Sequence, residues 1–206
     1  MPTPVFYLLA GPNGAGKSTL YRAAVAERLI PVAAEFVNAD LYEAVHLRHV
    51  TDPQARSLQA RVWADARRSE CLAKGLSFAS ETVFSHTSKL DLMAAARRAG
   101  FSVVLLVVCV DDPQQLLGRV SRRVEEGGHP VPHERILARY PRTVRHLGVA
   151  VRWADLALLY DTSQPAGDAF QPPRLVARLR AGGVVWQAEP LPAWAQRVLS
   201  PDPTQR

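Results

Sequence analysis

The segment that most constrains the fold is residues 11–18, which read GPNGAGKS and are followed by Thr19. This is the GxxxxGK(S/T) pattern of a phosphate-binding P-loop, which lies between a strand and a helix. Both flanks agree with it: residues 5–10 are apolar and strand-like, and residues 18–29 contain helix formers with few breakers. The sequence therefore predicts a strand, a phosphate-binding loop and a helix in direct succession.

In such a loop the backbone N–H groups of residues 14–18 surround a nucleotide phosphate at the N-terminus of the helix. Lys17 supplies a positive charge to the β- and γ-phosphates, and the hydroxyl of Ser18 binds Mg²⁺. The residues predicted to bind the nucleotide are Gly11, Pro12, Asn13, Gly14, Ala15, Gly16, Lys17, Ser18 and Thr19. The loop alone does not separate a kinase from an ATPase, a GTPase or a transporter subunit.

Strand-like and helix-like segments alternate along the rest of the chain. Strands are expected at 35–38, 76–80, 101–110 and 154–161, a hairpin at 174–187, and helices at 41–50, 53–74, 89–99 (capped by Ser88), 113–126, 133–147 and 193–199. The alternation predicts an α/β fold with a doubly wound, mainly parallel sheet of the P-loop NTPase or kinase type and a helical lid. We expect a core at 1–163 and a C-terminal extension at 164–206 that packs on it and ends in a frayed tail.

Composition limits the classes of function. The longest apolar run, 103–110, is far shorter than the roughly 20 residues of a membrane span, so no membrane association is expected. The N-terminus lacks a basic region and is interpreted as a core strand, not a signal peptide. Cys71 and Cys109 are far apart and predict no disulfide framework, which suits a cytoplasmic location. The net charge of +6 comes from dispersed arginines, which favours polyanionic small-molecule substrates over nucleic acid.

Acidic residues follow three of the predicted strands, and we expect all of them to converge near the transferred phosphate. Asp40 is a candidate general base for an attacking hydroxyl, although a helix cap or turn is the alternative. Glu81, beside Thr82, is a candidate for holding substrate hydroxyls, or Mg²⁺ through water. The third group, Asp111 and Asp112, lacks the Asp-Glu pair of an energy-coupling ATPase, and Asp112 with Pro113 more plausibly begins a helix.

Arginines are concentrated on either side of a Gly-Gly-His-Pro break at 127–130. They are Arg119, Arg122, Arg123, Arg135, Arg139 and Arg142. Two arginine-bearing helices joined at a glycine hinge predict a lid at about 119–147 that brings guanidinium groups onto phosphates and excludes water. The alternative is a solvated pair of amphipathic helices.

Four segments together resemble the zeta-toxin family of P-loop kinases. They are GPNGAGKST at 11–19, Asn-Ala-Asp at 38–40, Ser-Glu-Thr at 80–82, and the pattern RVxxRVxxGGHxVPxxxIxxRYxR at 119–142. Residues 160–163, Tyr-Asp-Thr-Ser, resemble the family's Tyr-Asp-Asn-Ser, but Thr162 replaces the asparagine and puts that residue's contact in doubt. The resemblance covers residues 5–163.

The resemblance implies a kinase that uses ATP and Mg²⁺ to phosphorylate the 3′-hydroxyl of the amino sugar in UDP-N-acetylglucosamine. It implies that Lys17 binds the γ-phosphate, that Ser18 holds Mg²⁺, that Asp40 deprotonates the sugar hydroxyl, and that Glu81 and Thr82 bind the sugar. Arg123 and Arg139 would clamp phosphate charge, with Arg142 supporting them at the nucleotide. A small antitoxin partner is a feature of the family. Other acceptors, including a polynucleotide 5′-end, and an ATPase module that drives a partner protein, stay open as alternatives.

Overall fold

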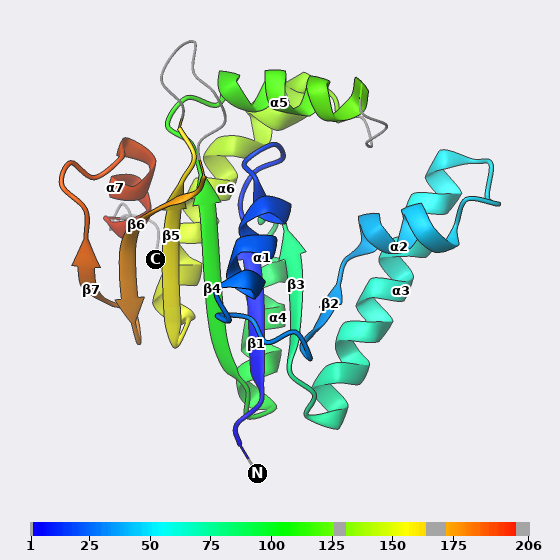
Figure 1. Ribbon diagram of the computed structural model, residues 1–206, viewed down its shortest axis with the longest axis horizontal. Helices are drawn as coiled ribbons and strands as arrows, with labels where there is room; N and C mark the ends of the chain where they lie inside the picture. The colour runs from blue at the N-terminus through cyan, green and yellow to red at the C-terminus, as the bar shows by residue number, and fades with distance from the viewer. Residues whose placement is uncertain (1, 126–130, 164–171, 201–206) are drawn as a thin grey trace.

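The computed structural model describes residues 2–125, 131–163 and 172–200. Its centre is a seven-stranded sheet in the order β2-β3-β1-β4-β5-β6-β7 (Figure 1). The first five strands of the chain are parallel: β1 (Val5–Ala10), β2 (Glu35–Val37), β3 (Phe78–Thr82), β4 (Ser102–Cys109) and β5 (Leu156–Asp161). Two antiparallel strands, β6 (Arg174–Arg180) and β7 (Gly183–Gln187), complete one edge. This architecture confirms the predicted α/β fold.

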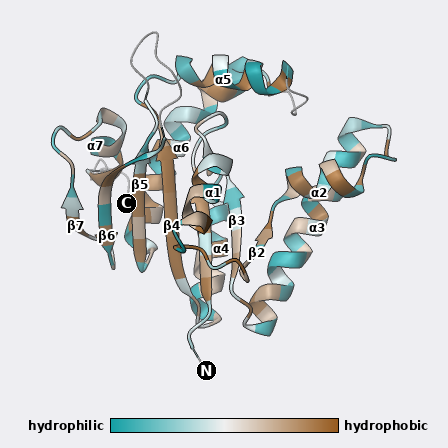
Figure 2. Ribbon diagram, in the orientation of Figure 1, coloured by the Kyte–Doolittle hydropathy of each residue, from teal (hydrophilic) through white to brown (hydrophobic). Residues whose placement is uncertain are grey.

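The middle of the sheet carries the hydrophobic core. The central strands β1 and β4 are in register from Val5 opposite Ser102 to Ala10 opposite Val107, and β4 is buried along almost all of its length. Figure 2 shows β4 as a continuous hydrophobic strand. The rings of Phe6 and Phe78 stack with centroids 4.5 Å apart and so join β1 to β3. A continuous Val/Leu run forms such a strand because helices cover both of its faces.

The described residues form seven helices, which connect and cover the strands. They are α1 (Lys17–Ala26), α2 (Ala39–His46), α3 (Pro53–Lys74), α4 (Ser88–Arg98), α5 (Gln114–Glu125), α6 (His133–Trp153) and α7 (Ala193–Leu199). In Figure 1, α1 lies in front of the sheet, α4 and α6 lie behind it, and α5 crosses above the carboxyl ends of the strands. The carboxyl ends of β1, β3 and β4 therefore face the space below α5, where a doubly wound fold places its ligand.

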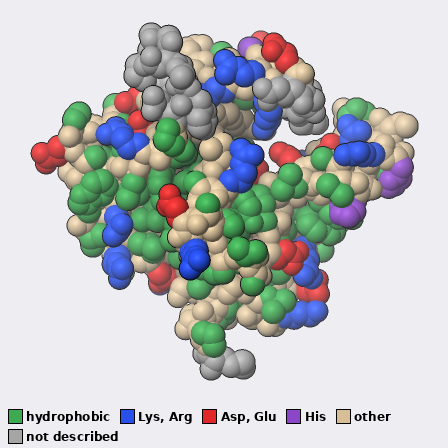
Figure 3. All heavy atoms as spheres, in the orientation of Figure 1, with side chains coloured by type: hydrophobic (Ala, Val, Ile, Leu, Met, Phe, Trp, Pro, Cys, Tyr) green, Lys and Arg blue, Asp and Glu red, His purple; other side chains and the backbone are tan. Residues whose placement is uncertain are grey.

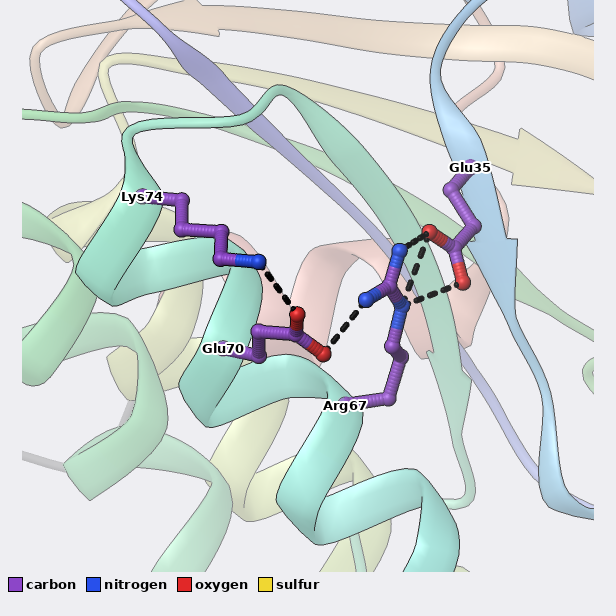
Figure 4. Close-up of polar contacts among 4 residues, drawn as sticks. All are labelled: Glu35, Arg67, Glu70 and Lys74. Atoms are coloured by element: carbon purple, nitrogen blue, oxygen red, sulfur yellow. Dashed lines mark hydrogen bonds and ion pairs between the residues drawn. The ribbon is translucent and has the colours of Figure 1, made fainter.

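Helices α2 and α3, residues 39–74, form an arm that projects from the β2 edge of the sheet (Figure 1). Within the arm, the rings of Tyr42 and Trp63 stack with centroids 3.9 Å apart. Arg67 of α3 ties the arm to β2 through Glu35, at 2.6 Å between Nη2 and Oε2 (Figure 4). Glu70 extends the network because it accepts from both Arg67 and Lys74. The base of the arm is therefore fixed against the strand that leads to it.

Several helix boundaries differ from the sequence prediction, and three of the differences have a clear physical basis. Helix α2 begins at Ala39, because the side chain of Asn38 accepts a hydrogen bond from the backbone N–H of Leu41 at 3.1 Å. The predicted cap of α4 by Ser88 is wrong: Ser88 is the first helical residue, and no side chain caps this helix. Helix α6 continues to Trp153 because its last two turns bury apolar residues against the sheet.

The C-terminal extension, so far as it is described, joins the core through β6, β7 and α7. Strand β6 pairs with β5, and α7 packs against α6 with the side chain of Trp194 fully buried. The predicted loop at 164–173 falls mostly, and the predicted tail almost wholly, outside the described residues, as does the break at 127–130. In the described ranges, no helix combines the length and the apolar character that crossing a bilayer requires.

Both cysteines have buried thiols, and burial raises the pKa of Cys109 to about 12. The native thiol therefore stays protonated at pH 8, where only a thiolate would react. We expect no rapid labelling of the native protein by a disulfide reagent at pH 8, and reaction of both thiols in urea. Because the unfolded thiol ionises near its ordinary pKa of 9.0 while the native one keeps its proton, stability should also fall as the pH rises above 9. Rapid labelling of Cys109 in the native state would contradict this packing.

Candidate active site

The P-loop lies tightly against the end of β4. A Cβ atom at Gly11 would come within 2.0 Å of the carbonyl oxygen of Val108, so only glycine fits there. Gly14 has a φ of +80°, and a Cβ atom there would lie 2.8 Å from the carbonyl oxygen of Leu116 in α5. Helix α1 begins at Lys17, directly after the loop. The backbone N–H groups of its first turn therefore point toward the loop, which makes this end of α1 suited to an anion.

Lys17 is the centre of charge in the site. Its Nζ donates to the carbonyl oxygens of Gly11 and Pro12, at 3.1 and 3.2 Å. Burial lowers the pKa of Lys17, and the nearby carboxylates of Glu81 and Asp40 oppose that shift. The positive charge of Arg123, like burial, lowers the pKa of Lys17. The fold thus brings Lys17, Asp40, Glu81 and Arg123, which lie far apart in the sequence, within electrostatic range of one another.

The two acidic residues occupy different surroundings. Asp40 lies exposed in the first turn of α2, and Asn38, not Asp40, caps that helix. Glu81 lies near the end of β3, and its Oε2 is buried without a hydrogen-bond partner among the described residues. A buried carboxylate oxygen without a donor is costly unless a ligand satisfies it. Glu81 is therefore the side chain whose surroundings most clearly call for a bound group.

Thr82 has a largely structural position. Its backbone carbonyl accepts from the N–H of Gly11 at 3.2 Å, and its hydroxyl accepts from the N–H of Phe84 at 3.1 Å. The first contact joins the end of β3 to the start of the P-loop. Its hydroxyl proton is still available for a substrate oxygen.

The arginines of α5 and α6 differ in how far they are buried. Arg123 and Arg139 are half-buried, whereas Arg122, Arg135 and Arg142 are exposed. Arg139 lies one turn before Thr143, whose hydroxyl donates to the carbonyl of Val83 just beyond β3. Figure 3 shows a hollow between α5 and the arm, with both basic and acidic side chains around it.

Helix α6, which belongs to the predicted lid at 119–147, is firmly attached to the core. The hydroxyl of Tyr140 donates to the carbonyl of Val110, and Ile136, Val144 and Leu147 are buried. Moving α6 as a unit would expose these side chains. Helix α6 therefore forms a fixed wall beside the site.

The expectation that all three acidic groups converge on the phosphate is wrong for Asp111 and Asp112. Oδ1 of Asp111 accepts from the backbone N–H of Trp194 at 2.7 Å, so this carboxylate holds the start of α7. Oδ1 of Asp112 accepts from the N–H of Gln114 at 2.9 Å, at the start of α5. Both carboxylates are committed to helix N-termini.

Thr162 and Arg119, both named in the sequence analysis, adjoin the P-loop through contacts that the sequence did not predict. The hydroxyl of Thr162 donates to the carbonyl of Ala15 at 2.9 Å, and Arg119 donates to Thr162. The motif at 160–163 had drawn attention to Thr162, and its position directly after β5 places it at the same sheet edge as the loop. Its partner lies 147 residues away, beyond the reach of any local pattern.

The described residues contain no group of three or more His, Cys, Asp or Glu side chains arranged to hold a metal ion. A P-loop magnesium site needs fewer protein ligands, because phosphates and waters complete the octahedron. The Ser18 hydroxyl at the start of α1 and the unpaired Oε2 of Glu81 are oxygen donors of the required kind. The residues present therefore fit Mg²⁺ bound together with a nucleotide.

The fold and the loop define a P-loop nucleotide-binding protein with a kinase-like fold. A family model described as an AAA domain matches residues 7–145, and the chain belongs to this family. A search of curated proteins found no match.

Three solved structures share the fold. The AvrRxo1-ORF1:ORF2 complex with ATP aligns with a TM-score of 0.69 and 16% identity, covering 97% of this chain and 64% of that one. The PezAT toxin–antitoxin system of Streptococcus pneumoniae aligns at 0.63 and 16%, covering 97% and 78%. The Pnkp1/Rnl/Hen1 RNA repair complex aligns at 0.54 and 18%, covering 69% and 45%. The chain thus spans less than two thirds of the AvrRxo1 chain, and likeness at this identity establishes the fold alone.

Proposed function

We propose that this protein is a kinase that transfers the γ-phosphate of ATP to a hydroxyl group of a small molecule. The observation that carries the proposal is the shared electrostatic environment of Lys17, Asp40, Glu81 and Arg123. A phosphate-binding lysine, two carboxylates and an arginine at one sheet edge match the needs of phosphoryl transfer, which depends on positioning and charge neutralisation.

Each residue has a role in this proposal. The P-loop amides and Lys17 hold the β- and γ-phosphates, and Ser18, with Glu81 through water, holds Mg²⁺. When bound, Mg²⁺ neutralises phosphate charge. Asp40 accepts the proton of the acceptor hydroxyl while the acceptor oxygen bonds to the γ-phosphorus and ADP leaves. Arg123 and Arg139 stabilise the charge on the transferred group, and Arg142 supports them from the exposed face.

For the acceptor we propose a nucleotide sugar, specifically the 3′-hydroxyl of the amino sugar in UDP-N-acetylglucosamine, bound by Asp40, Glu81 and Thr82. The sequence resemblance to zeta toxins and the fold shared with the PezAT system support it. Two of the similar structures are two-component complexes, which supports a small antitoxin as a possible partner.

A polynucleotide 5′-hydroxyl is the second candidate acceptor. The fold shared with an RNA repair complex and the net charge of +6 favour it. An ATPase module that drives a partner has less support, because Asp111, at the position where such a module needs a metal-binding or water-activating acid, is bound to the N-terminus of α7.

One assay separates these activities. The purified protein is incubated with γ-labelled ATP and Mg²⁺ together with UDP-N-acetylglucosamine, other nucleotide sugars, a 5′-hydroxyl oligonucleotide, or water alone. We expect label on UDP-N-acetylglucosamine and little free phosphate. Label on the oligonucleotide would show that the acceptor is a polynucleotide 5′-hydroxyl. Phosphate release as the sole product would refute the kinase proposal.

Replacing Arg139 with alanine tests the arginine wall of the site. We expect kcat to fall on the order of 10²-fold, because the guanidinium acts on charge that develops in the transition state. The Kd for ATP should change less than threefold, since that charge is not fully developed in the ground state. Turnover and equilibrium binding are measured on the same preparation. The matched control is Arg135→Ala, an exposed arginine one turn earlier on α6. A large loss of ATP affinity with unchanged kcat would assign Arg139 to ground-state binding.

A further inference from the structure

We propose that Thr162 is a positioning residue for the P-loop, and that Arg119 orients its hydroxyl. The inference rests on the proposed binding of ATP and extends it to residues outside the P-loop. Thr162 touches no transferred group in this proposal. It acts through the peptide that joins Ala15 to Gly16.

Thr162 is held rigidly at the end of the parallel sheet. It is only 7% exposed, and its backbone N–H donates to the carbonyl of Cys109, at the end of β4, at 3.0 Å. Its hydroxyl has two carbonyl oxygens in reach, Ala15 at 2.9 Å and Cys109 at 3.4 Å. A hydroxyl has a single proton to donate, and the shorter distance assigns it to Ala15.

Arg119 fixes the direction of that proton. Its Nη1 donates to the hydroxyl oxygen of Thr162 at 3.2 Å, and its Nη2 donates to the backbone carbonyl of the same residue at 2.5 Å. A guanidinium can only donate, so the hydroxyl must accept from Arg119 and pass its own proton onward. The result is a one-way chain of hydrogen bonds from Arg119 through Thr162 to Ala15.

The end of this chain sets the orientation of a phosphate-binding amide. In a trans peptide the C=O and the following N–H point in opposite directions. With the carbonyl of Ala15 held by Thr162, the N–H of Gly16 points away from Thr162. Gly16 has a φ of +95°. Because glycine adopts positive and negative φ about equally, the backbone itself does not fix the orientation of this peptide. Thr162 is the partner that holds it.

The C-terminal extension supports the same corner from behind. Oδ1 of Asp161 accepts from the indole Nε1 of Trp194 at 2.9 Å and from the hydroxyl of Ser163 at 2.8 Å. Together with the contact between Asp111 and the backbone of Trp194, these bonds attach α7 to the ends of β4 and β5. Thr162 therefore lies between two fixed neighbours, so losing its hydroxyl should affect the loop more than the sheet.

The test compares Thr162→Val, which removes the hydroxyl and keeps the shape, with Thr162→Ser, which keeps the hydroxyl. The dissociation constants of ATP, ADP and AMP are measured by calorimetry, and thermal melting confirms folding. We expect Thr162→Val to weaken ATP and ADP binding about tenfold, the usual scale for a buried hydrogen bond. AMP, which lacks a β-phosphate, should bind as to the wild type, and Thr162→Ser should stay within about threefold for all three ligands.

The outcomes separate this inference from the proposed function. If the wild type binds ATP and Thr162→Val binds it equally well, the positioning role is overturned and the kinase proposal stands. Equal losses for AMP and ATP assign Thr162 a general structural role and also overturn the inference. Absence of ATP binding by the wild type overturns both. If Thr162→Val does not fold, Arg119→Lys, which removes the paired donors and keeps the charge, must show the same selective loss for ADP and ATP.

Discussion

Replacing Lys17 with alanine should abolish measurable phosphotransfer, a loss on the order of 10³-fold or more in kcat/KM. The Nζ of Lys17 is already desolvated in the loop and is held by two carbonyl oxygens that cannot neutralise it. A bound phosphate supplies the negative charge that neutralises Lys17. Without Lys17, the carboxylates of Asp40 and Glu81 would instead repel the negatively charged phosphates. Initial rates measured over a range of ATP concentrations below KM, with saturating acceptor, give the loss in kcat/KM.

Lys74 provides the matched control for this prediction. Lys74, in the last turn of α3, is exposed and pairs with Glu70 at the surface. Lys74→Ala should therefore keep wild-type turnover, because an exposed pair of this kind contributes little. Activity in Lys17→Ala above about a tenth of the wild type, with an unchanged melting temperature, would remove Lys17 from the centre of the mechanism.

Asp40→Asn should lower kcat by about 10²–10⁴-fold while ATP binding stays close to that of the wild type. The asparagine keeps the shape of the side chain but cannot accept the acceptor's proton. The helix should not be disturbed, because Asn38 provides the cap. Single-turnover measurements with prebound ATP isolate the chemical step.

Asp91→Asn is the matched control for Asp40→Asn, since Asp91 is also an exposed acid in the first turn of a helix, α4. It should leave turnover unchanged. If Asp40→Asn also retains turnover and a native fold, Asp40 is not the base, and Glu81 becomes the residue to test.

The sequence was most informative where a pattern is local. The P-loop, the buried Val/Leu run of β4 and the alternation of strands and helices each depend on neighbouring residues, and together they predicted the sheet. The end of α6 was placed too early because its last two turns are covered by the sheet and by α7, and a local pattern does not show which partner covers a helix.

The site was predictable only in part, for the same reason. Asp40, Glu81 and the P-loop follow parallel strands, so topology alone brings them to one edge. The roles of Asp111 and Thr162 depend on partners 83 and 147 residues away in the sequence. No spacing rule distinguishes an acid that caps a distant helix from one that faces a phosphate.

The burial of Trp194 gives the protein an internal optical reporter. Of the four tryptophans, Trp153 and Trp186 are 41% and 47% exposed, Trp63 is half-buried in the arm, and Trp194 is sealed from solvent. A soluble quencher such as acrylamide should therefore suppress the outer indoles first and leave a blue-shifted emission from Trp194. Because its indole bonds to Asp161, next to Thr162, that residual fluorescence would follow strain at the nucleotide end of the sheet without any added dye.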